Sequence, residues 1–584
     1  MHRPSTPHPV RPRTGRGLVL LAIAAALAGA PLAQPLSFVD LRPGVVGGAP
    51  TEFVVFDGAL YFTADDSPHG RELWRTDGTV SGTTLVKDIN SGGDDSRPSE
   101  FFAFDGALYF SADDGATGRE LWRTDGTAAG TTLVKDINPG PEGSLATRRI
   151  TEFVVDRFAA LGGALYFAAD DGAHGIELWR TDGTETGTVL VKDIRPGPDG
   201  SVDPPNRTDF DLTPFKGALY FQASNGTDGY ELWRTDGTAA GTALVKDIQP
   251  GAESGFPQSF VGFDGALYFA ANDGTAGIEL WRTDGTAAGT VLVKDILPGP
   301  GDGFGFDSLM EMAEFDGALY FWAEDSLDDI ELWKSDGTPS GTARVRDIKP
   351  GPGASYPTHF HVFDGALYFR ATDGTHGFEP WRTDGTEAGT VLVKDVDPGP
   401  DNGFVARQGD PGFVDVDGAL YFVADDGVTG RELWSTDGTE AGTALVGDVN
   451  PGAGDGQVST SGIELAEFDG ALYFNATDGA AGVELWKLGA PPFMGGVAAE
   501  GGPDPEPLAV LAWPNPAADR LRVAVVGAGG GPVQVEVVDV LGRRVAAAVG
   551  TWAEVDVSGR APGPYVVRAR AGARTATRVV TVGE

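Results

Sequence analysis

The sequence predicts an all-β protein whose main part is a nine-bladed β-propeller of four-stranded blades, followed by a small immunoglobulin-like β-sandwich. Three observations lead to this fold class. The segment GALYF occurs nine times, and a tryptophan follows each of its leucines after 14 residues. Each unit holds four short apolar runs parted by Gly and Asp turn signals, which is the pattern of an antiparallel meander. The ninth unit lacks its last strand, and a matching strand stands alone before the first unit.

The repeat has a period near 50 residues, which is typical of propellers and other repeat architectures. The leucines are Leu60, Leu108, Leu165, Leu219, Leu267, Leu319, Leu367, Leu420 and Leu472. The tryptophans are Trp74, Trp122, Trp179, Trp233, Trp281, Trp333, Trp381, Trp434 and Trp486.

The second unit illustrates the predicted strands SEFFAF, ALYFSA, RELWRT and TTLVKDI. Asp105-Gly106 between the first two predicts a two-residue hairpin turn. Side chains alternate along a strand, so Leu108 and Phe110 point to one face and Tyr109 to the other. A sheet with two apolar faces must be covered on both, which favours sheets packed face to face in a ring.

The ends of the array predict how the ring closes. The ninth unit stops at VELWKLGAPP, whereas SFVDLRPG from Ser37 to Gly44 aligns with LVKDINPG from Leu133 to Gly140. We therefore expect the N-terminal strand to complete the last blade. An open solenoid or two smaller rings are the alternatives, because nine exceeds the usual four to eight blades.

The turn DGTxxGT between the third and fourth strands is similar to the Asp-box hairpin of other propellers. Its aspartate is expected to accept hydrogen bonds from backbone N–H groups and lock the turn. These structural aspartates are Asp77, Asp125, Asp182, Asp236, Asp284, Asp336, Asp384 and Asp437.

The repeated motif ELWRTDGT resembles that of the ELWxxDGT-repeat proteins, which are secreted proteins of bacterial origin. The resemblance covers residues 36–488 and implies an exported repeat protein, with little implied about activity.

A Pro/Gly-rich linker at residues 489–507 precedes a C-terminal segment, residues 508–584, of short alternating strands. This segment resembles the type A C-terminal sorting domain of the type IX secretion system (T9SS) of Bacteroidota-like bacteria. The motif residues are Pro514, Asn515, Pro516, Gly542, Arg543, Pro562, Gly563 and Tyr565. The resemblance implies the secretion machinery as a partner and a secreted or cell-surface location. An ordinary immunoglobulin-like binding domain is the alternative.

The N-terminus has several arginines followed by the apolar run GLVLLAIAAALAGA, which predicts a signal peptide at residues 1–33. The sequence contains no second long apolar run, so no transmembrane segment is predicted in the mature chain. A formal net charge of -41 disfavours nucleic acid as a partner. The absence of cysteine excludes disulfides and cysteine-based zinc sites.

Length varies only between the VKD aspartate and the next GALYF, so these connections and the turns joining strands two and three mark the predicted ligand-binding face. That face also carries paired acidic residues, which are weak candidates for calcium, the one cofactor considered. They are Asp65, Asp66, Asp113, Asp114, Asp170, Asp171, Asp425 and Asp426.

The preferred function is a non-catalytic binding or adhesion scaffold with a glycan or protein ligand. The alternative is a polysaccharide-acting hydrolase or lyase, which would need a cluster of charged residues found in one blade only. The candidates for that cluster are Arg148, Arg149, Asp156 and Arg157, in the longest connection. His359 and His361 are expected on one face of a strand, where they could form a metal pair. No catalytic residue is assigned.

Overall fold

The computed structural model describes most of the repeat region and the strands of the C-terminal segment. The described ranges are 36–43, 46–145, 158–202, 210–304, 311–326, 328–406, 410–452, 454–456, 463–489, 509–513, 520–526, 533–538, 543–549, 552–556, 563–571 and 574–582. The predicted signal peptide and linker lie outside them. Every regular element in these ranges is a β-strand, which confirms the all-β prediction. None of the described residues belongs to a helix that is long and apolar enough to cross a membrane.

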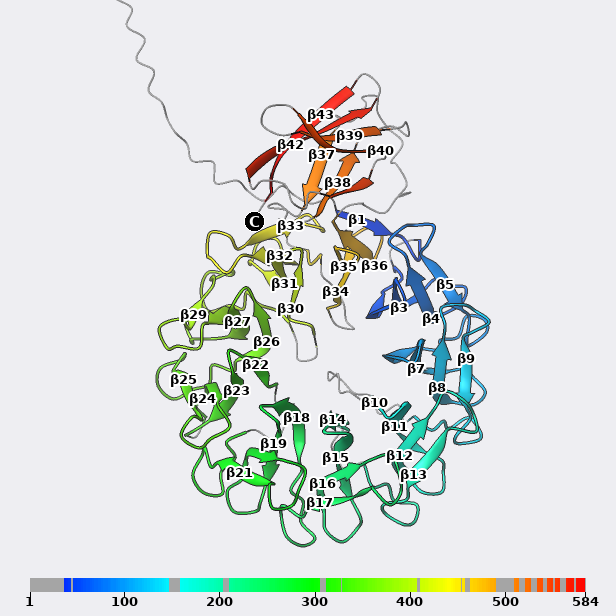
Figure 1. Ribbon diagram of the computed structural model, residues 1–584, viewed down its shortest axis with the longest axis vertical. Coiled ribbons are helices and arrows are strands. Elements are labelled where there is room, and N and C mark those ends of the chain that lie inside the picture. Colours follow the sequence, from blue (N-terminus) through cyan, green and yellow to red (C-terminus); the bar gives the residue numbers. More distant parts are fainter. Residues whose placement is uncertain are drawn as a thin grey trace, which may run out of the picture. The chain divides into compact units, whose positions relative to one another are not determined.

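Between residues 36 and 488 the described strands form nine antiparallel sheets of four strands each. The sheets follow one another in chain order (Figure 1), and they are consistent with the blades of a β-propeller. Each sheet takes its strands consecutively from the chain, except that the ninth has the order β1-β36-β35-β34.

The first strands of the nine sheets are β2 (Thr51–Phe56), β6 (Ser99–Phe104), β10 (Ala159–Leu161), β14 (Thr213–Phe215), β18 (Gln258–Phe263), β22 (Ala313–Phe315), β26 (Thr358–Phe363), β30 (Phe413–Val416) and β34 (Leu465–Phe468). The second strands are β3 (Ala59–Asp65), β7 (Ala107–Asp113), β11 (Ala164–Asp170), β15 (Ala218–Ser224), β19 (Ala266–Asn272), β23 (Ala318–Glu324), β27 (Ala366–Ala371), β31 (Ala419–Asp425) and β35 (Ala471–Thr477).

The third strands are β4 (Arg71–Thr76), β8 (Arg119–Thr124), β12 (Ile176–Thr181), β16 (Tyr230–Thr235), β20 (Ile278–Thr283), β24 (Ile330–Ser335), β28 (Glu379–Thr383), β32 (Arg431–Thr436) and β36 (Val483–Leu488). The fourth strands are β5 (Thr84–Lys87), β9 (Thr132–Lys135), β13 (Val189–Lys192), β17 (Ala243–Lys246), β21 (Val291–Lys294), β25 (Ala343–Arg346), β29 (Val391–Leu392), β33 (Ala444–Gly447) and, for the ninth sheet, β1 (Leu36–Val39).

The turn between the first two strands has the geometry that its sequence predicts. Asp105 has φ 46° and Gly106 has φ 75°, so both central residues are left-handed. A two-residue turn of this kind matches the twist of the strands it joins, and Gly and Asp adopt its φ values at low cost. The hairpin register pairs Phe104 with Ala107.

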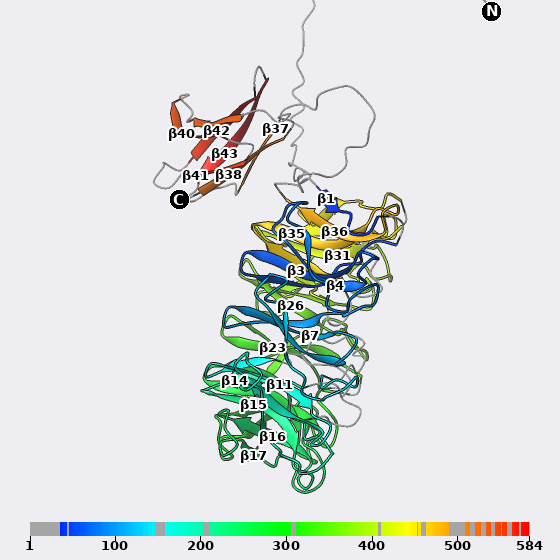
Figure 2. The same cartoon turned by 90° about the vertical axis from the view of Figure 1, so that its right-hand side faces the viewer.

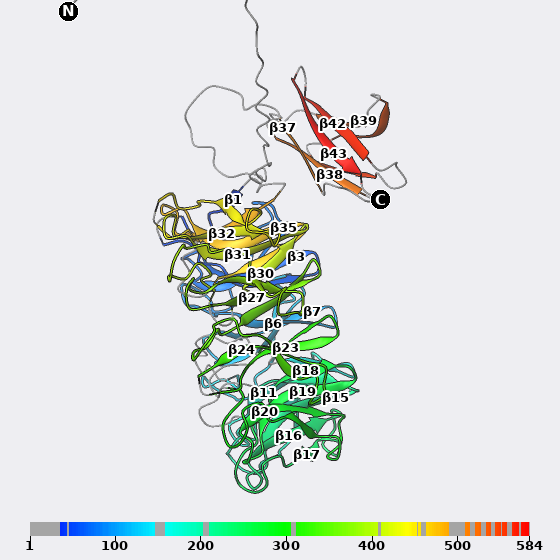
Figure 3. The ribbon, with the colours of Figure 1, turned by 90° about the vertical axis from the view of Figure 1, so that its left-hand side faces the viewer.

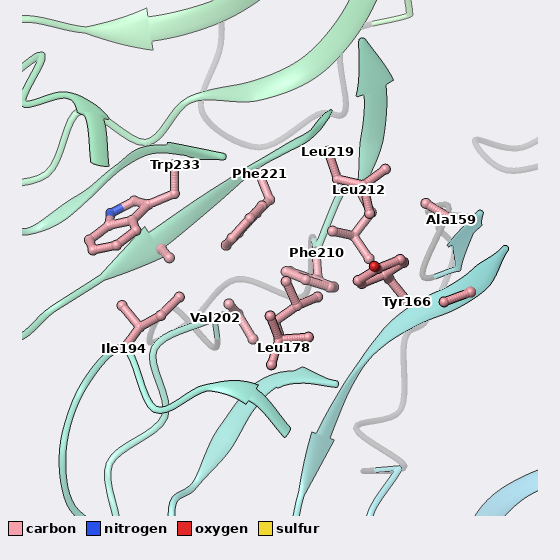
Figure 4. Packing of buried hydrophobic residues seen from close by; sticks show 13 residues of the cluster. Ala159, Tyr166, Leu178, Ile194, Val202, Phe210, Leu212, Leu219, Phe221 and Trp233 are labelled. Atoms are coloured by element: carbon pink, nitrogen blue, oxygen red, sulfur yellow. The ribbon is translucent and has the colours of Figure 1, made fainter. Parts of the chain in front are cut away.

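Both faces of each sheet are buried against a neighbouring sheet. Leu108, Phe110 and Trp122 pack on Tyr61 and Leu73 of the preceding sheet. Figure 4 shows the equivalent cluster between the third and fourth sheets, where Phe221 and Trp233 meet Leu178 and Ile194. Burial of a large apolar side chain contributes about 1.5–3 kcal/mol, so these interfaces can stabilise the fold without disulfides.

The N-terminal strand completes the ninth sheet. β1 pairs antiparallel with β36, which places Phe38 opposite Trp486, and the two rings stack with centroids 4.8 Å apart. Val39 and Leu41 then pack with Leu60 and Phe62 of the first sheet. In Figure 2, β35 and β36 lie beside β3 and β4. The order of contacts among the nine sheets is therefore cyclic.

The C-terminal segment forms two further antiparallel sheets. One has the order β37-β38-β41 and the other β40-β39-β42-β43. The bounds are β37 (Ala509–Trp513), β38 (Arg520–Val526), β39 (Val533–Val538), β40 (Arg544–Val549), β41 (Trp552–Asp556), β42 (Gly563–Ala571) and β43 (Arg574–Val582). Val537, Tyr565 and Val567 are buried in this segment.

We expect Val39→Asp to lower the free energy of unfolding of the repeat region by several kcal/mol. Val39 is buried between the ninth and first sheets, and a lone carboxylate placed there has no counter-charge. The control is Thr132→Asp, at an exposed residue of the equivalent outer strand β9. Calorimetry checks the prediction, and equal melting temperatures for the two variants would contradict it.

Candidate functional site

The glutamate of the ELW motif is fully buried in all nine sheets. These residues are Glu72, Glu120, Glu177, Glu231, Glu279, Glu331, Glu379, Glu432 and Glu484. In the fourth sheet, Glu231 Oε2 accepts a hydrogen bond from Ile248 N at 2.7 Å. Its Oε1 accepts from Gln249 N at 3.3 Å and from Gly255 N at 2.7 Å. The carboxylate thus binds three backbone N–H groups of the connection to the next sheet and holds that connection around it.

Burial also changes the acidity of these glutamates. Burial raises the pKa of Glu231 to about 7 and that of Glu279 to about 8, although the N–H donors act in the opposite direction. The pKa of each of the other seven is raised to about 7 or 8 for the same reason. Because the same group recurs in every sheet with the same partners, its role is structural.

Basic side chains repeat in the same way between sheets. Lys246 Nζ donates to Thr290 O of the next sheet at 2.8 Å and lies 5.6 Å from the centroid of the Trp281 ring. The same lysine and tryptophan pairing joins the first and second sheets through Lys87 and Trp122. A cation over an aromatic ring is a favourable contact, so these residues fix one sheet on the next.

The eight turn aspartates have one arrangement. In each turn the aspartate Oδ1 accepts from both the backbone N and the Oγ1 of the threonine two residues later, as Asp236 does from Thr238 at 2.9 and 2.7 Å. The other seven are Asp77, Asp125, Asp182, Asp284, Asp336, Asp384 and Asp437. These bonds close the turn locally.

The acidic pairs considered for calcium use oxygens within their own turns. The first aspartate accepts a backbone N–H two residues later, as Asp113 does from Gly115 and Asp425 from Gly427; Asp170 and Asp65 do likewise. The second aspartates, Asp66, Asp114, Asp171 and Asp426, accept the N–H three residues later. Calcium binding at these turns stays a prediction.

A different trio of carboxylates lies close enough together to bind a metal. Asp329, Glu331 and Asp347 have ligand atoms within 4.8 Å of one another, the one such group found among the described residues. Glu331 already accepts from Ile348 N at 2.8 Å, and Asp329 Oδ2 lies 3.1 Å from Arg344 Nη1. Asp329 Oδ1 is buried without a hydrogen-bond partner among the described residues, so these contacts leave one oxygen of the group unaccounted for.

The repeats differ at one exposed position of their first strands. In every sheet this residue pairs with the GALYF leucine, as Val55 does with Leu60. It is uncharged in six sheets, as Val55, Ala103, Ala160, Pro214, Gly262 and Val362. It is acidic in three, as Glu314, Asp415 and Glu467. At this position, therefore, only the sixth, eighth and ninth sheets carry negative charge.

A cavity of about 450 Å³ is lined by residues of β26, β30 and β34. These three strands follow one another in Figure 1, and Figure 3 shows β30 beside its partner strand β31. The lining residues of the cavity are His361, Phe413, Val414, Asp415, Val416, Asp417 and Glu467. His361 Nε2 lies 3.0 Å from Asp415 Oδ1, so the pair joins β26 to β30 across two sheets. Glu467 Oε1 accepts from Gly470 N at 2.8 Å. The lining combines apolar side chains with carboxylates, which suits a ligand that carries a positive charge.

The expectation that His359 and His361 share one face is wrong. A β-bulge between Thr358 and His361, with φ 59° at His359, breaks the alternation of side chains. The His359 ring is buried beside Phe404, whereas His361 reaches Asp415. The two imidazoles therefore do not form a metal pair.

Carboxylates from neighbouring first strands accept the N–H groups at such bulges. Glu464 Oε1 accepts from Glu52 N at 3.0 Å, and Glu52 Oε2 accepts from Glu100 N at 3.3 Å. Burial, together with the charge of Glu52, raises the pKa of Glu464 to about 7. This acidic pair has the features of an acid/base dyad, but its oxygens are occupied in joining strands.

The proposed hydrolase candidates Arg148, Arg149, Asp156 and Arg157 lie outside the described residues, as do Pro514, Asn515, Pro516, Gly542 and Pro562 of the sorting motif. The sequence reasoning missed the cavity. Its signal was available, since Glu314, Asp415 and Glu467 occupy one repeat position, but recognising it required the strand register.

Residues 511–582 match the family model of the secretion system C-terminal sorting domain. This is the sorting domain of type IX secretion. The match confirms the prediction of a type IX sorting domain in the tail and indicates export, with a secreted or cell-surface location, and interaction with the type IX machinery. Arg543, Gly563 and Tyr565 are the motif residues that the structure describes.

The other comparisons give no close relative. No curated protein matches the chain. A puromycin hydrolase structure is 15% identical, with 77% of this chain and 65% of that chain covered and a TM-score of 0.32. A puromycin-hydrolyzing peptidase from Mycobacterium tuberculosis is 12% identical, with 67% and 61% covered and a TM-score of 0.32. The β-propeller domain of the trilobed protease from Pyrococcus furiosus is 10% identical, with 59% and 96% covered and a TM-score of 0.26.

The chain spans less than two thirds of the length of the two hydrolytic enzymes. At these scores no activity or substrate is transferred from them.

We expect the free energy of unfolding to fall as pH rises from about 5 to about 8. The nine buried glutamates have a pKa of about 7 or 8 when folded against about 4.3 when unfolded, so the folded state binds more protons in this window. Chemical denaturation at several pH values measures the slope, to which each glutamate adds up to about 1.4 kcal/mol per pH unit.

Glu279→Gln removes one titrating group and should make the slope shallower, whereas exposed Glu387→Gln should leave it unchanged. Stability that rises between pH 5 and pH 8 would contradict the prediction.

Proposed function

We propose that this protein is a type IX-exported binding scaffold, made of nine blades closed in one ring and an immunoglobulin-like sorting domain. Closure is supported by four contacts between the chain's N-terminal segment or first sheet and its last sheet. These are the β1–β36 pairing, the Val39 and Leu41 core, Lys487 Nζ donating to Gly78 O at 3.3 Å, and the bonds of Glu484 to Leu41 N and Gly48 N.

The observation that carries the binding function is the cavity at β26, β30 and β34. It lies at the eighth and ninth sheets, which carry an acidic residue where most other sheets carry an uncharged one. A specific ligand site in a repeat protein has to use residues that the other repeats lack. Asp415 and Glu467 supply negative charge, and Val414 and Phe413 supply apolar surface. The ligand that fits is one with a cationic group on an apolar stem.

A hydrolase or lyase is the weaker candidate. Acid/base chemistry needs a carboxyl group that is both perturbed in pKa and available to a substrate. The described carboxyl groups with a pKa raised to about 7 or 8, the ELW glutamates and Glu464, have oxygens engaged by backbone N–H groups. Their arrangement favours binding over catalysis.

Deletion of residues 511–582 should leave the repeat region folded but retained in the periplasm. The sorting domain directs export, whereas the nine sheets bury their core without it. Immunoblots of periplasmic, surface and medium fractions measure the location. Unchanged surface or medium levels of the truncated protein would contradict the prediction.

The cavity should bind a short lysine peptide, and the double variant Asp415→Asn with Glu467→Gln should bind it at least tenfold more weakly. Both substitutions remove charge from the cavity at nearly constant volume. Asp57→Asn is the matched control, because Asp57 is an exposed turn aspartate on the first sheet and does not line the cavity. Calorimetric titration measures the affinity.

Equal weakening by Asp57→Asn would show that the overall charge of the protein, and not the cavity, attracts the peptide. The cavity would then be discarded as the ligand site.

A further inference from the structure

Arg370, on the second strand of the seventh sheet, has no acceptor for its buried nitrogen. Its Nε is buried without a hydrogen-bond partner among the described residues. Burial lowers the pKa of Arg370 to about 10. A buried, unpaired donor costs about 1–3 kcal/mol, more when it carries charge, so a retained one requires an explanation.

Two other repeats show what an arginine in this region does when its role is structural. Arg119 of the second sheet donates through Nη1 to Ser111 Oγ at 2.8 Å and through Nη2 to Arg97 O at 2.8 Å. Its Nε is also buried without a partner, so Arg370 differs in that none of its guanidinium nitrogens donates a hydrogen bond to a described residue. Arg71 of the first sheet donates through Nη1 to Ala49 O at 2.9 Å. In the seventh sheet the position of Arg119 is taken by Phe378, and the arginine comes instead from the neighbouring strand, at the position of Ser111.

The guanidinium of Arg370 stacks on an aromatic ring. Its central carbon lies 3.5 Å from the centroid of Phe378, so one face of the group is covered. Such stacking holds the planar group in one orientation and leaves its edge to donate hydrogen bonds. A guanidinium edge matches a carboxylate, which it can bind through two parallel N–H bonds.

An exposed tyrosine stands next to this arrangement. Tyr356, in the connection before β26, is 49% exposed, and its ring centroid lies 6.4 Å from that of Phe378. Tyr356 has φ 47°, and Arg97 and Phe256 have the same backbone conformation at the equivalent position. The conformation is therefore a property of the repeat, and only the tyrosine side chain is particular to this connection. Tyr356 is the one aromatic among the exposed large apolar residues that the structure describes.

We propose that Arg370, Phe378 and Tyr356 form a binding site for a sugar that carries a carboxylate, namely a uronic acid residue of a glycan. The edge of the Arg370 guanidinium takes the carboxylate, and the exposed ring of Tyr356 takes the apolar face of the sugar ring. None of the three residues is among those that line the acidic cavity.

The test uses the full-length secreted protein with trigalacturonic acid as the probe and a neutral galactose trimer for comparison. Titration calorimetry should show binding of the acidic trimer alone. Arg370→Val should weaken binding at least tenfold, and Tyr356→Ala should weaken it severalfold. Valine is chosen because the eighth sheet has Val423 at this position. The matched control Arg97→Ala removes an exposed arginine from the equivalent connection and should change nothing.

Thermal unfolding separates this role from a structural one. Since the Arg370 side chain makes no hydrogen bond to a described residue, Arg370→Val should melt at the same temperature as the native protein or higher. A loss of several degrees would assign Arg370 to the fold and overturn the proposal. Equal binding of both trimers, or binding only of a peptide with a free terminal carboxylate, would overturn it as well.

Discussion

The buried carboxylate of the ELW motif is the interaction on which the repeat region depends. A connection that crosses from the edge of one sheet to the start of the next has backbone N–H groups that no strand can satisfy, and burying them unpaired is costly. Glu231 accepts three of them, from Ile248, Gln249 and Gly255. Each glutamate thereby sets where the next sheet begins, and the sheets follow with nearly constant geometry.

The same interaction explains why closure uses the N-terminus. Glu484 of the ninth sheet has no following connection to hold, and its oxygens accept instead from Leu41 N at 2.8 Å and Gly48 N at 3.1 Å. The segment after β1 therefore plays the part that each inter-sheet connection plays elsewhere. Strand pairing and the carboxylate act together, because β1 alone is only four residues long.

The sequence was sufficient for features that are local or periodic. Leu108, Tyr109 and Trp122 alternate as a strand requires, and their spacing predicts the faces on which they are buried. The partner of β36 followed from the alignment of residues 37–44 with residues 133–140, although β1 and β36 themselves lie more than 400 residues apart. Prediction was wrong at His359 because a bulge depends on the backbone of the neighbouring strand, which the alternation rule ignores. The sequence could not single out Arg370, because the lack of a hydrogen-bond acceptor for its Nε depends on which side chains surround it in the folded protein.

Repetition also decides where function can reside in such a molecule. A residue that recurs with equivalent partners in all nine sheets, such as Glu231, or in eight, such as Asp236, is explained by the fold, however reactive its chemistry. A residue that occurs in one sheet only, and that destabilises the fold through an uncompensated charge or an unpaired donor, requires another explanation. Asp415 and Glu467 concentrate like charge at one side of the first strands, and Arg370 keeps a buried cation unpaired. In an acidic chain of net charge -41, carboxylate partners for that arginine are abundant in sequence. That none of the described ones reaches it leaves its free N–H groups to a carboxylate from outside the chain.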